Sequence, residues 1–287
     1  MRTLLYALLV AVLIMGTAQA GTILLVSDCN DPGTAGGDHN DDSFVTWLAS
    51  LGHTVDTYGM GQQMREDLDA TDLDHANDAD LIIVSRKTDS GKYNKPSQWN
   101  TLATPLILCS GYLTRDSRWK WTAGGSQDAT KSETDMDIDD ALTGHDFVAG
   151  VSDPTGLFDW SGVPAGDNQA PKGVYLPKKD GTADFDDEAT VIGTFDGFDM
   201  LADLPAGATM SNGDVLAARR AFLSHWGYDD PTTGTNGPGG TPSEWEDYIT
   251  DDYKTVLGNM VGTMIPEPAT LTLLGLGLGA MLVRRRK

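Results

Sequence analysis

Short runs of apolar residues without polar alternation recur through the first half of the chain. Three of them, Thr22–Ser27, Leu81–Ser85 and Leu106–Cys109, are almost wholly apolar, which is typical of strands covered on both faces. The segment from Ser43 to Gly52 places its apolar residues at helical spacing and ends at a glycine, as an amphipathic helix does. Because strands alternate with helices, we expect an α/β fold: a flavodoxin-like three-layer sandwich with a mostly parallel sheet.

Weaker patterns predict the remaining elements. We expect a short strand at 53–58, helices at 66–76 and 96–102, and strands at 190–195 and 215–223. Beyond Tyr112 the alternation is looser, although Asp180-Gly181 has the signal of a hairpin turn. A capping box at Thr241–Glu244, with proline at the first helical position, predicts a last helix that begins there and runs to Thr263.

The beginning of the chain has the three parts of a secretory signal peptide. Arg2 supplies a positive charge, residues 4–15 are apolar, and Ala18 and Ala20 are small residues at the expected cleavage positions. The apolar run is short for a membrane-spanning helix. We therefore expect signal peptidase to cleave after Ala20, so that the mature chain begins at Gly21.

The other end combines Pro266-Glu267-Pro268, an apolar segment at 271–283, and four cations, Arg284, Arg285, Arg286 and Lys287. Clustered cations are retained on the cytoplasmic side of a membrane, which would place the domain outside. The apolar segment is shorter than the roughly 20 residues of an ordinary spanning helix. A temporary transmembrane anchor is therefore expected.

This tail resembles the PEP-CTERM sorting signal. The resemblance implies that a membrane exosortase recognises Pro266, Glu267 and Pro268 and releases or transfers the protein to the cell surface or the extracellular space. It also implies a bacterium that makes exopolysaccharide or a biofilm. The chain then divides into a signal peptide at 1–20, a domain at 21–263 and a sorting tail at 264–287.

Charge limits the choice of partners. The chain has 20 Lys and Arg against 42 Asp and Glu, and without Arg2 and the four terminal cations 15 oppose 42, a formal net charge of −27. So acidic a surface repels phosphate backbones, which excludes nucleic acid as a partner. Solubility outside the cell explains the charge, and attraction of calcium is the alternative.

The order of elements, with the segments Leu81–Arg86 and Ala217–Asp229, resembles the class I glutamine amidotransferase-like superfamily, nearest its trehalose-utilisation (ThuA-like) branch. That superfamily carries a nucleophile on a glycine-flanked strand-to-helix turn and a base histidine followed by a carboxylate. Here Cys109 lacks the preceding glycine, and His225 is followed by Trp226. A non-catalytic domain is therefore our first hypothesis, and a secreted hydrolase or sugar-processing enzyme is the alternative.

Ligands in open α/β sheets bind beyond the carboxyl ends of the strands. This rule selects five candidate residues: Asp28, Arg86, Ser110, Tyr112 and Arg115. Cys109 is a weak candidate for a catalytic thiol, because a thiol needs a lowered pKa and a base. It could instead be buried, or pair with Cys29 in an oxidising compartment.

No cofactor is expected, and calcium binding is the alternative. Asp135, Asp137 and Asp139 alternate as in a calcium loop, but the turn glycine and the closing glutamate are missing. His39 with Asp38 and Asp41 is a second weak group of metal ligands. A calcium- or glycan-binding module is therefore a third alternative. Its sugar-stacking rings would be Trp119 and Trp121, which could equally cover an edge of the core.

Overall fold

The computed structural model describes most of the domain but neither end of the chain. It describes residues 20–28, 39–61, 63–86, 88–122, 127–129, 136–139, 142–153, 156–159, 175–177, 188–195, 198–225, 243–246 and 249–265. Within these ranges no helix has the length and apolar character needed to cross a membrane. The apolar segments at 4–15 and 271–283, and the hairpin predicted at Asp180-Gly181, lie outside them.

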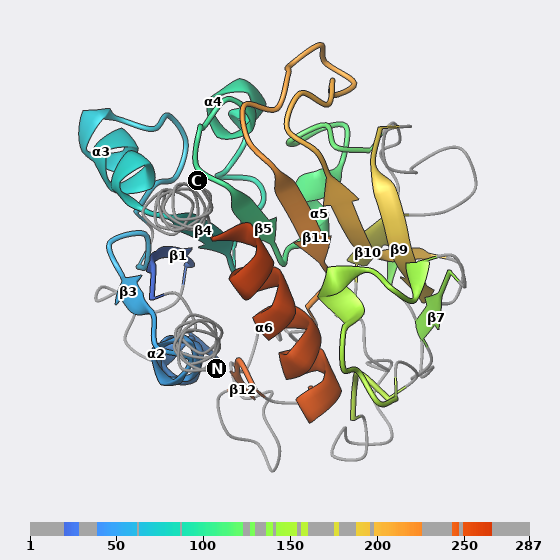
Figure 1. Ribbon diagram of the computed structural model, residues 1–287. Coiled ribbons are helices and arrows are strands. Elements are labelled where there is room, and N and C mark those ends of the chain that lie inside the picture. Colours follow the sequence, from blue (N-terminus) through green and yellow to red (C-terminus); the bar gives the residue numbers. More distant parts are fainter. Residues whose placement is uncertain are drawn as a thin grey trace, which may run out of the picture.

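Strands and helices alternate through the first half of the domain, as predicted (Figure 1). The strands are β1 Thr22–Val26, β2 His39–Asn40, β3 Thr54–Asp56, β4 Leu81–Val84, β5 Leu106–Leu108, β6 Gln127–Ala129, β7 Met136–Ile138, β8 Tyr175–Pro177, β9 Thr190–Phe195, β10 Phe198–Leu204, β11 Arg220–Leu223 and β12 Ser243–Glu244. The α-helices are α2 Asp42–Ser50, α3 Ala70–Asp78, α4 Pro96–Asn100, α5 Gly111–Thr114 and α6 Asp251–Met264, and Asp146–Val148 forms the 3-10 helix η2.

The main sheet has eight strands in the order β3-β1-β4-β5-β11-β10-β9-β7. The strands from β3 to β11 run parallel, and β10, β9 and β7 continue the sheet in antiparallel pairings. Numbered along the chain, the parallel strands lie in the order 2-1-3-4-5, which is the flavodoxin-like order. The predicted fold class is confirmed.

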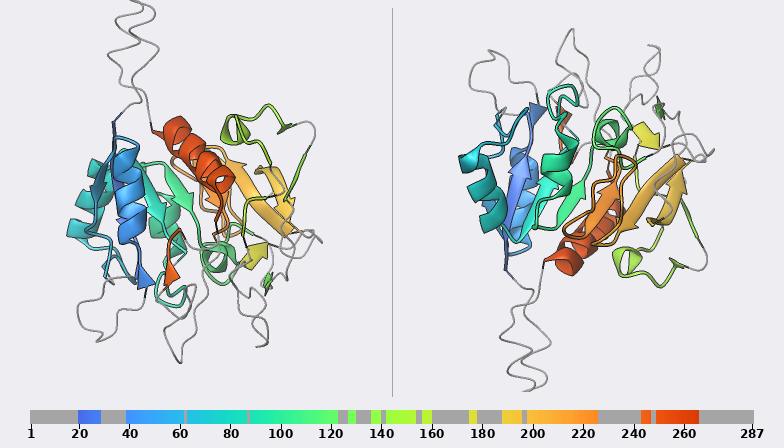
Figure 2. Two further views of the ribbon diagram at one scale, coloured as in Figure 1. Left: turned by 90° about the horizontal axis from the view of Figure 1, so that it is seen from below. Right: turned by 90° about the horizontal axis from the view of Figure 1, so that it is seen from above.

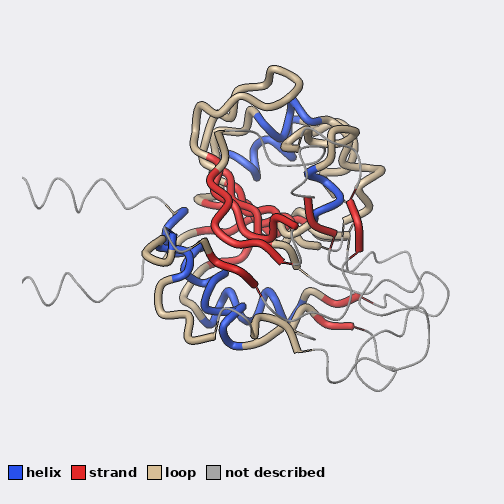
Figure 3. Tube along the Cα trace, turned by 90° about the vertical axis from the view of Figure 1, so that its right-hand side faces the viewer, coloured by secondary structure: helices blue, strands red, loops and turns tan. Residues whose placement is uncertain are grey.

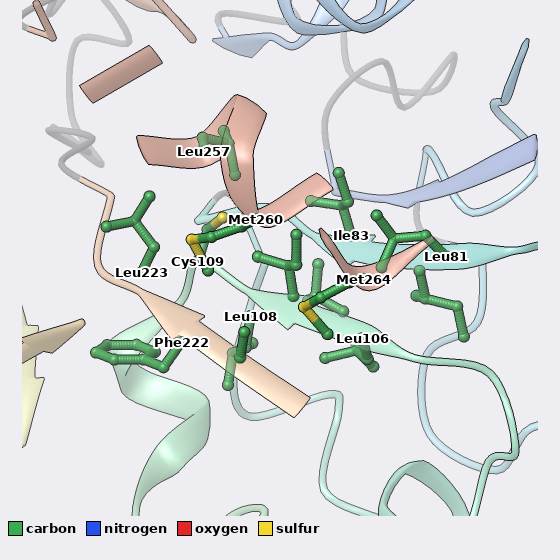
Figure 4. Close-up of a cluster of buried hydrophobic side chains, with 14 of the residues drawn as sticks. Leu81, Ile83, Leu106, Leu108, Cys109, Phe222, Leu223, Leu257, Met260 and Met264 are labelled. Atoms are coloured by element: carbon green, nitrogen blue, oxygen red, sulfur yellow. The ribbon is translucent and has the colours of Figure 1, made fainter. Parts of the chain in front are cut away.

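The inner parallel strands β1, β4 and β5 are apolar because both faces of the sheet are covered there. Residues 23–26, 81–84 and 106–108 are all buried. Figure 2 shows α2 and α6 on one face of the sheet and α3 on the other, and in Figure 3 helices lie on both sides of the strands. Helix α6 packs its apolar side on β5 and β11, where Met260 and Leu257 meet Leu223 (Figure 4).

The predicted start of the last helix is wrong. Residues 243–244 form β12, which pairs with β2, and the helix begins at Asp251. The side chain of Thr250 accepts a hydrogen bond from the backbone N–H of Tyr253 (3.3 Å) and caps this helix, and two aspartates follow in its first turn, where negative charge is favourable. Trp245 instead stacks on Phe44, with ring centroids 4.4 Å apart.

Two other boundaries differ from the predictions by four residues or more. Helix α3 begins at Ala70 rather than residue 66, because Asp69 and Asp72 form a reciprocal capping box there. Strand β11 covers only Arg220–Leu223 of the predicted 215–223. Strand β10 was not predicted; Asp199 and Asp203 interrupt its apolar run, and Asp203 forms a bidentate ion pair with Arg219 (2.8 and 2.7 Å).

Arg220 is a buried cation that joins β11 to the end of α4. Its guanidinium donates to the carbonyl oxygens of Thr104 (2.8 Å), Leu102 (2.6 Å), Trp99 (3.2 Å) and Asn100 (3.3 Å). Burial lowers the pKa of Arg220 to about 10, so it remains charged at neutral pH. A planar guanidinium group suits this role because its several N–H donors point in different directions.

We predict that Arg220→Met destabilises the domain by about 3 kcal/mol, since it leaves several buried carbonyl oxygens without donors. The thermal midpoint should fall by roughly 6–12 °C for a domain of this size. Lys92→Met is the matched control, because the ion pair of Lys92 with Glu66 (3.6 Å) is on the surface. Equal midpoints for the two variants in a circular-dichroism melt would contradict the anchoring role.

Candidate functional site

The carboxyl ends of β1, β4 and β5 lie together at one edge of the sheet. Val26 pairs with Val84, and Val84 pairs with Leu108, so the residues that follow each strand are neighbours. Asp28, Arg86 and Ser110 all belong to these segments. The edge selected from the sequence is therefore a contiguous part of the structure.

Asp28 joins two loops at this edge. Its carboxylate accepts hydrogen bonds from Arg65 Nε (2.8 Å), from the hydroxyl of Tyr93 (2.7 Å) and from the backbone N–H of Asp89. Burial, followed by the charge of Asp28, raises the pKa of Tyr93, which keeps its hydroxyl protonated as a donor. These contacts make Asp28 an organiser of the edge.

Arg86, Tyr112 and Arg115 form a cluster, called here the arginine–tyrosine cluster. The guanidinium carbons of Arg86 and Arg115 lie 5.1 and 5.0 Å from the centroid of the Tyr112 ring. Arg115 also donates to the carbonyl oxygen of Tyr112 (2.9 Å) and to the hydroxyl of Ser90 (3.1 Å), which fixes its orientation. Two guanidinium groups thus converge on one aromatic ring.

Ser110 and Ser224 place buried hydroxyls at neighbouring strand ends. Leu108 pairs with Phe222, so Ser110 and Ser224 follow at the same level of β5 and β11. Both side chains are buried, and among the described residues neither hydroxyl oxygen has a hydrogen-bond partner. Sequence reasoning selected Ser110 but not Ser224, because only the pairing of β5 with β11 brings the latter to this edge.

Cys109 has the environment of a core residue. Its side chain is 1% exposed and lies among Leu223, Leu257 and Met260 (Figure 4). Burial raises the pKa of the thiol, and the carboxylate of Asp41 raises it further. The thiol is free, and Cys29, its suggested disulfide partner, lies outside the described residues.

His225 is next to Cys109 but is held by another element. Its backbone N–H donates to the carbonyl oxygen of Cys109 (3.2 Å), whereas ring Nε2 lies 2.9 Å from the carbonyl oxygen of Trp245. Since a carbonyl only accepts, Nε2 carries the proton, and Nδ1 is the acceptor nitrogen of the neutral ring. It is the raised pKa of the buried Cys109 thiol that does not favour a thiol–imidazole pair.

Asp41 is a fully buried carboxylate that sequence reasoning considered only as a metal ligand. It accepts a hydrogen bond from the hydroxyl of Ser27 (2.6 Å), which directly follows β1. Its suggested co-ligand Asp38 lies outside the described residues, as does the side chain of His39. Within the described part of the chain, Asp41 therefore links the start of α2 to the end of β1.

Two aspartates of the suggested calcium loop, Asp137 and Asp139, lie in or next to the edge strand β7. Asp137 is in β7, an edge strand that pairs with β9, Asp139 follows it and is exposed, and Asp135 is outside the described residues. Among the residues that the structure describes, no three His, Cys, Asp or Glu side chains are placed to share a metal ion.

Trp119 and Trp121 cover the core rather than the surface. Both are buried, and their indole N–H groups donate to the carbonyl oxygen of Tyr93 (2.7 Å) and to the side chain of Asn100 (2.9 Å). Trp119 also stacks on Trp99, with centroids 4.9 Å apart. The structure therefore favours the second of the two alternatives, since these rings are not open to a sugar.

Comparison with known proteins identifies the C-terminal tail. A family model described as the PEP-CTERM protein-sorting motif matches residues 265–287. The motif supports an exported protein that exosortase sorts and that is transiently anchored at the membrane. The match leaves the domain itself unassigned.

No curated protein sequence matches the chain. One similar solved structure is described as the cytoplasmic protein STM3548 from Salmonella typhimurium; it is 12% identical, with a TM-score of 0.48, over 85% of this chain and 99% of that one. These findings do not test the amidotransferase-like resemblance, which stays a hypothesis.

We predict that native Cys109 resists alkylation by iodoacetamide at pH 8, because burial raises its pKa and shields the sulfur. Cys109 should react readily in denaturant without a reductant. Peptide mass spectrometry separates its labelling from that of Cys29. Rapid labelling of native Cys109 would contradict the buried position, and labelling that needs a reductant would show a disulfide.

Proposed function

We propose that the protein is an exported cell-surface or extracellular-matrix component whose α/β domain binds an anionic ligand without transforming it. The observation that carries this proposal is the arginine–tyrosine cluster at the carboxyl edge of the sheet. Its position agrees with the general rule for ligand sites in open α/β sheets.

The charge of the chain makes the cluster unusual. Between the signal peptide and the terminal cations, 15 Lys and Arg are set against 42 Asp and Glu. Such a domain repels anions in general, yet Arg86, only 5% exposed, is held beside Arg115 on one ring. Guanidinium groups match carboxylates in planar, bidentate geometry, so the cluster suits a carboxylate-bearing ligand.

An acidic exopolysaccharide supplies the required chemistry. Its uronic acid units carry carboxylates for Arg86 and Arg115, which lie over the ring of Tyr112. The sorting motif at 265–287 supports this choice, because it indicates an exported protein and such polymers lie outside the cell.

Binding without turnover agrees with the environment of the residues that could react. The pKa of the Cys109 thiol is raised by burial, and Nε2 of His225 donates to a backbone carbonyl. A complete site would need a nucleophile, a base and a group that orients the base. The observed geometry of Cys109 and His225 does not supply them.

We predict that calorimetric titration detects binding of an oligogalacturonate and not of a neutral oligosaccharide of equal length. Arg86→Gln and Arg115→Gln should each weaken binding about 10- to 100-fold, since each removes charged hydrogen-bond donors. Arg118→Gln is the matched control, because Arg118 lies in the same segment and donates to the carbonyl oxygen of Ser117. Equal affinity of all three variants would refute the cluster as the site.

A secreted hydrolase is the second candidate, and the position of Ser110 at a strand-to-helix turn favours it. Ser110 lies at the turn between β5 and α5 and its oxygen has no partner among the described residues. If Ser110 were a nucleophile, an amide, ester or glycoside would be turned over by the wild type and by Cys109→Ala, but not by Ser110→Ala. We predict no turnover of any of these substrates, and turnover that Ser110→Ala abolishes would instead establish the hydrolase.

A further inference from the structure

Gly21, the expected first residue of the mature chain, is buried at the amino end of β1. Its backbone N–H donates to Nδ1 of His53 (3.2 Å), and its carbonyl oxygen accepts from the backbone of Thr54 (2.9 Å). The next residue, Thr22, donates its N–H to the carboxylate of Asp80 (2.8 Å) and accepts from the Asp80 N–H (2.8 Å). The start of the mature chain is therefore fixed from both sides.

The last described residue lies against the same point. A Cβ at Gly21 would come within 3.0 and 3.1 Å of two side-chain carbons of Ile265, and within 3.2 Å of a carboxylate oxygen of Asp80. Ile265 is 4% exposed and is the first residue of the matched sorting motif. Figure 2 shows the start of β1 beside the end of α6 in both views. The mature amino terminus and the base of the sorting tail thus share one site.

Signal-peptide cleavage changes the chemistry of this site. Hydrolysis of the bond between Ala20 and Gly21 consumes one water and leaves a carboxylate on Ala20 and an ammonium group on Gly21. An α-ammonium group has an ordinary pKa near 8 and is charged at neutral pH. It needs acceptors for three N–H bonds, and the site already contains Nδ1 of His53 and the carboxylate of Asp80.

His53 is suited to accept from this ammonium group. Burial lowers its pKa, which keeps the imidazole neutral and leaves Nδ1 as an acceptor. Asp80 supplies the opposite charge from the turn between α3 and β4 and is itself solvent-exposed. His53 and Asp80 can therefore hold the ammonium group while the carboxylate stays in water. Burying both charges would be costly.

We propose that Asp80 and His53 form a charge-paired site for the mature amino terminus, and that this site fastens Gly21 beneath Ile265 at the base of the sorting tail. The inference rests on the proposed function in one respect, namely that export is what removes residues 1–20. Glycine has a role at position 21, since any larger side chain there would press on Ile265 and Asp80.

The site implies an order of events. Gly21 is buried and both its backbone groups are bonded in the folded domain. A protease needs extended, accessible chain on each side of the bond that it cuts, so signal peptidase must act before Gly21 docks. The amino terminus is then in place next to Ile265 when the sorting tail is processed.

The test is the pKa of the Gly21 amine in the exported full chain, measured by competitive labelling with isotope-coded acetylating reagent at several pH values. We predict a pKa about one unit above the ordinary value, so that labelling at neutral pH is about tenfold slower in the folded than in the denatured chain. Burial alone would slow labelling without raising the pKa, so the two effects are separable.

Asp80→Asn should return the amine pKa to its ordinary value while keeping an oxygen that accepts from Thr22 N–H. Asp78→Asn, at the exposed end of α3, is the matched control and should leave the pKa raised. An amine pKa that is the same in wild type and Asp80→Asn would overturn the charge-paired site.

The mass of the first peptide separates this failure from that of the export proposal. If the exported chain begins at a residue other than Gly21, the site is overturned although export stands. If the chain keeps residues 1–20 and stays in the cytosol, export itself fails.

Discussion

Burial of the parallel strands β1, β4, β5 and β11 on both faces is the constraint on which the rest of the structure depends. Residues 23–26, 81–84, 106–108 and 220–223 are all buried, so these strands leave no place for exposed polar groups along their length. Polar groups on these strands are therefore confined to the strand ends. Arg220 follows the same rule, because its guanidinium donates hydrogen bonds to carbonyl oxygens at the end of α4. This is why the two ends of the sheet differ in role.

The amino edge holds the two termini of the domain, and the carboxyl edge holds the arginine–tyrosine cluster. Gly21 and Ile265 lie side by side at one end of β1, and Asp28 lies beyond its other end, roughly 23 Å away for seven extended residues. A domain held by its sorting tail would therefore direct the proposed ligand site away from the membrane. Attachment and binding would then not compete for the same surface.

Local patterns explain what could be predicted from the sequence. The buried strands are continuous apolar runs, so their positions and the α/β class with a mostly parallel sheet could be predicted, as could the places of Arg86, Ser110 and Tyr112 after strands. Features made by distant contacts could not be predicted, such as the two guanidinium groups on one ring or Ser224 beside Ser110. The prediction of a helix start at Thr241–Glu244 failed because residues 243–244 pair with β2, and Thr250 caps the helix instead.

The central claim is that the chain is exported and then sorted through its tail, which presents the domain outside the cell. The most direct test is the mass of the C-terminal peptide of the protein recovered from the envelope and medium of the native host. We predict a peptide that has lost the cations at 284–287 and ends within or before the matched motif. An intact C-terminus ending at Lys287, found on protein in the cytosol, would contradict the account.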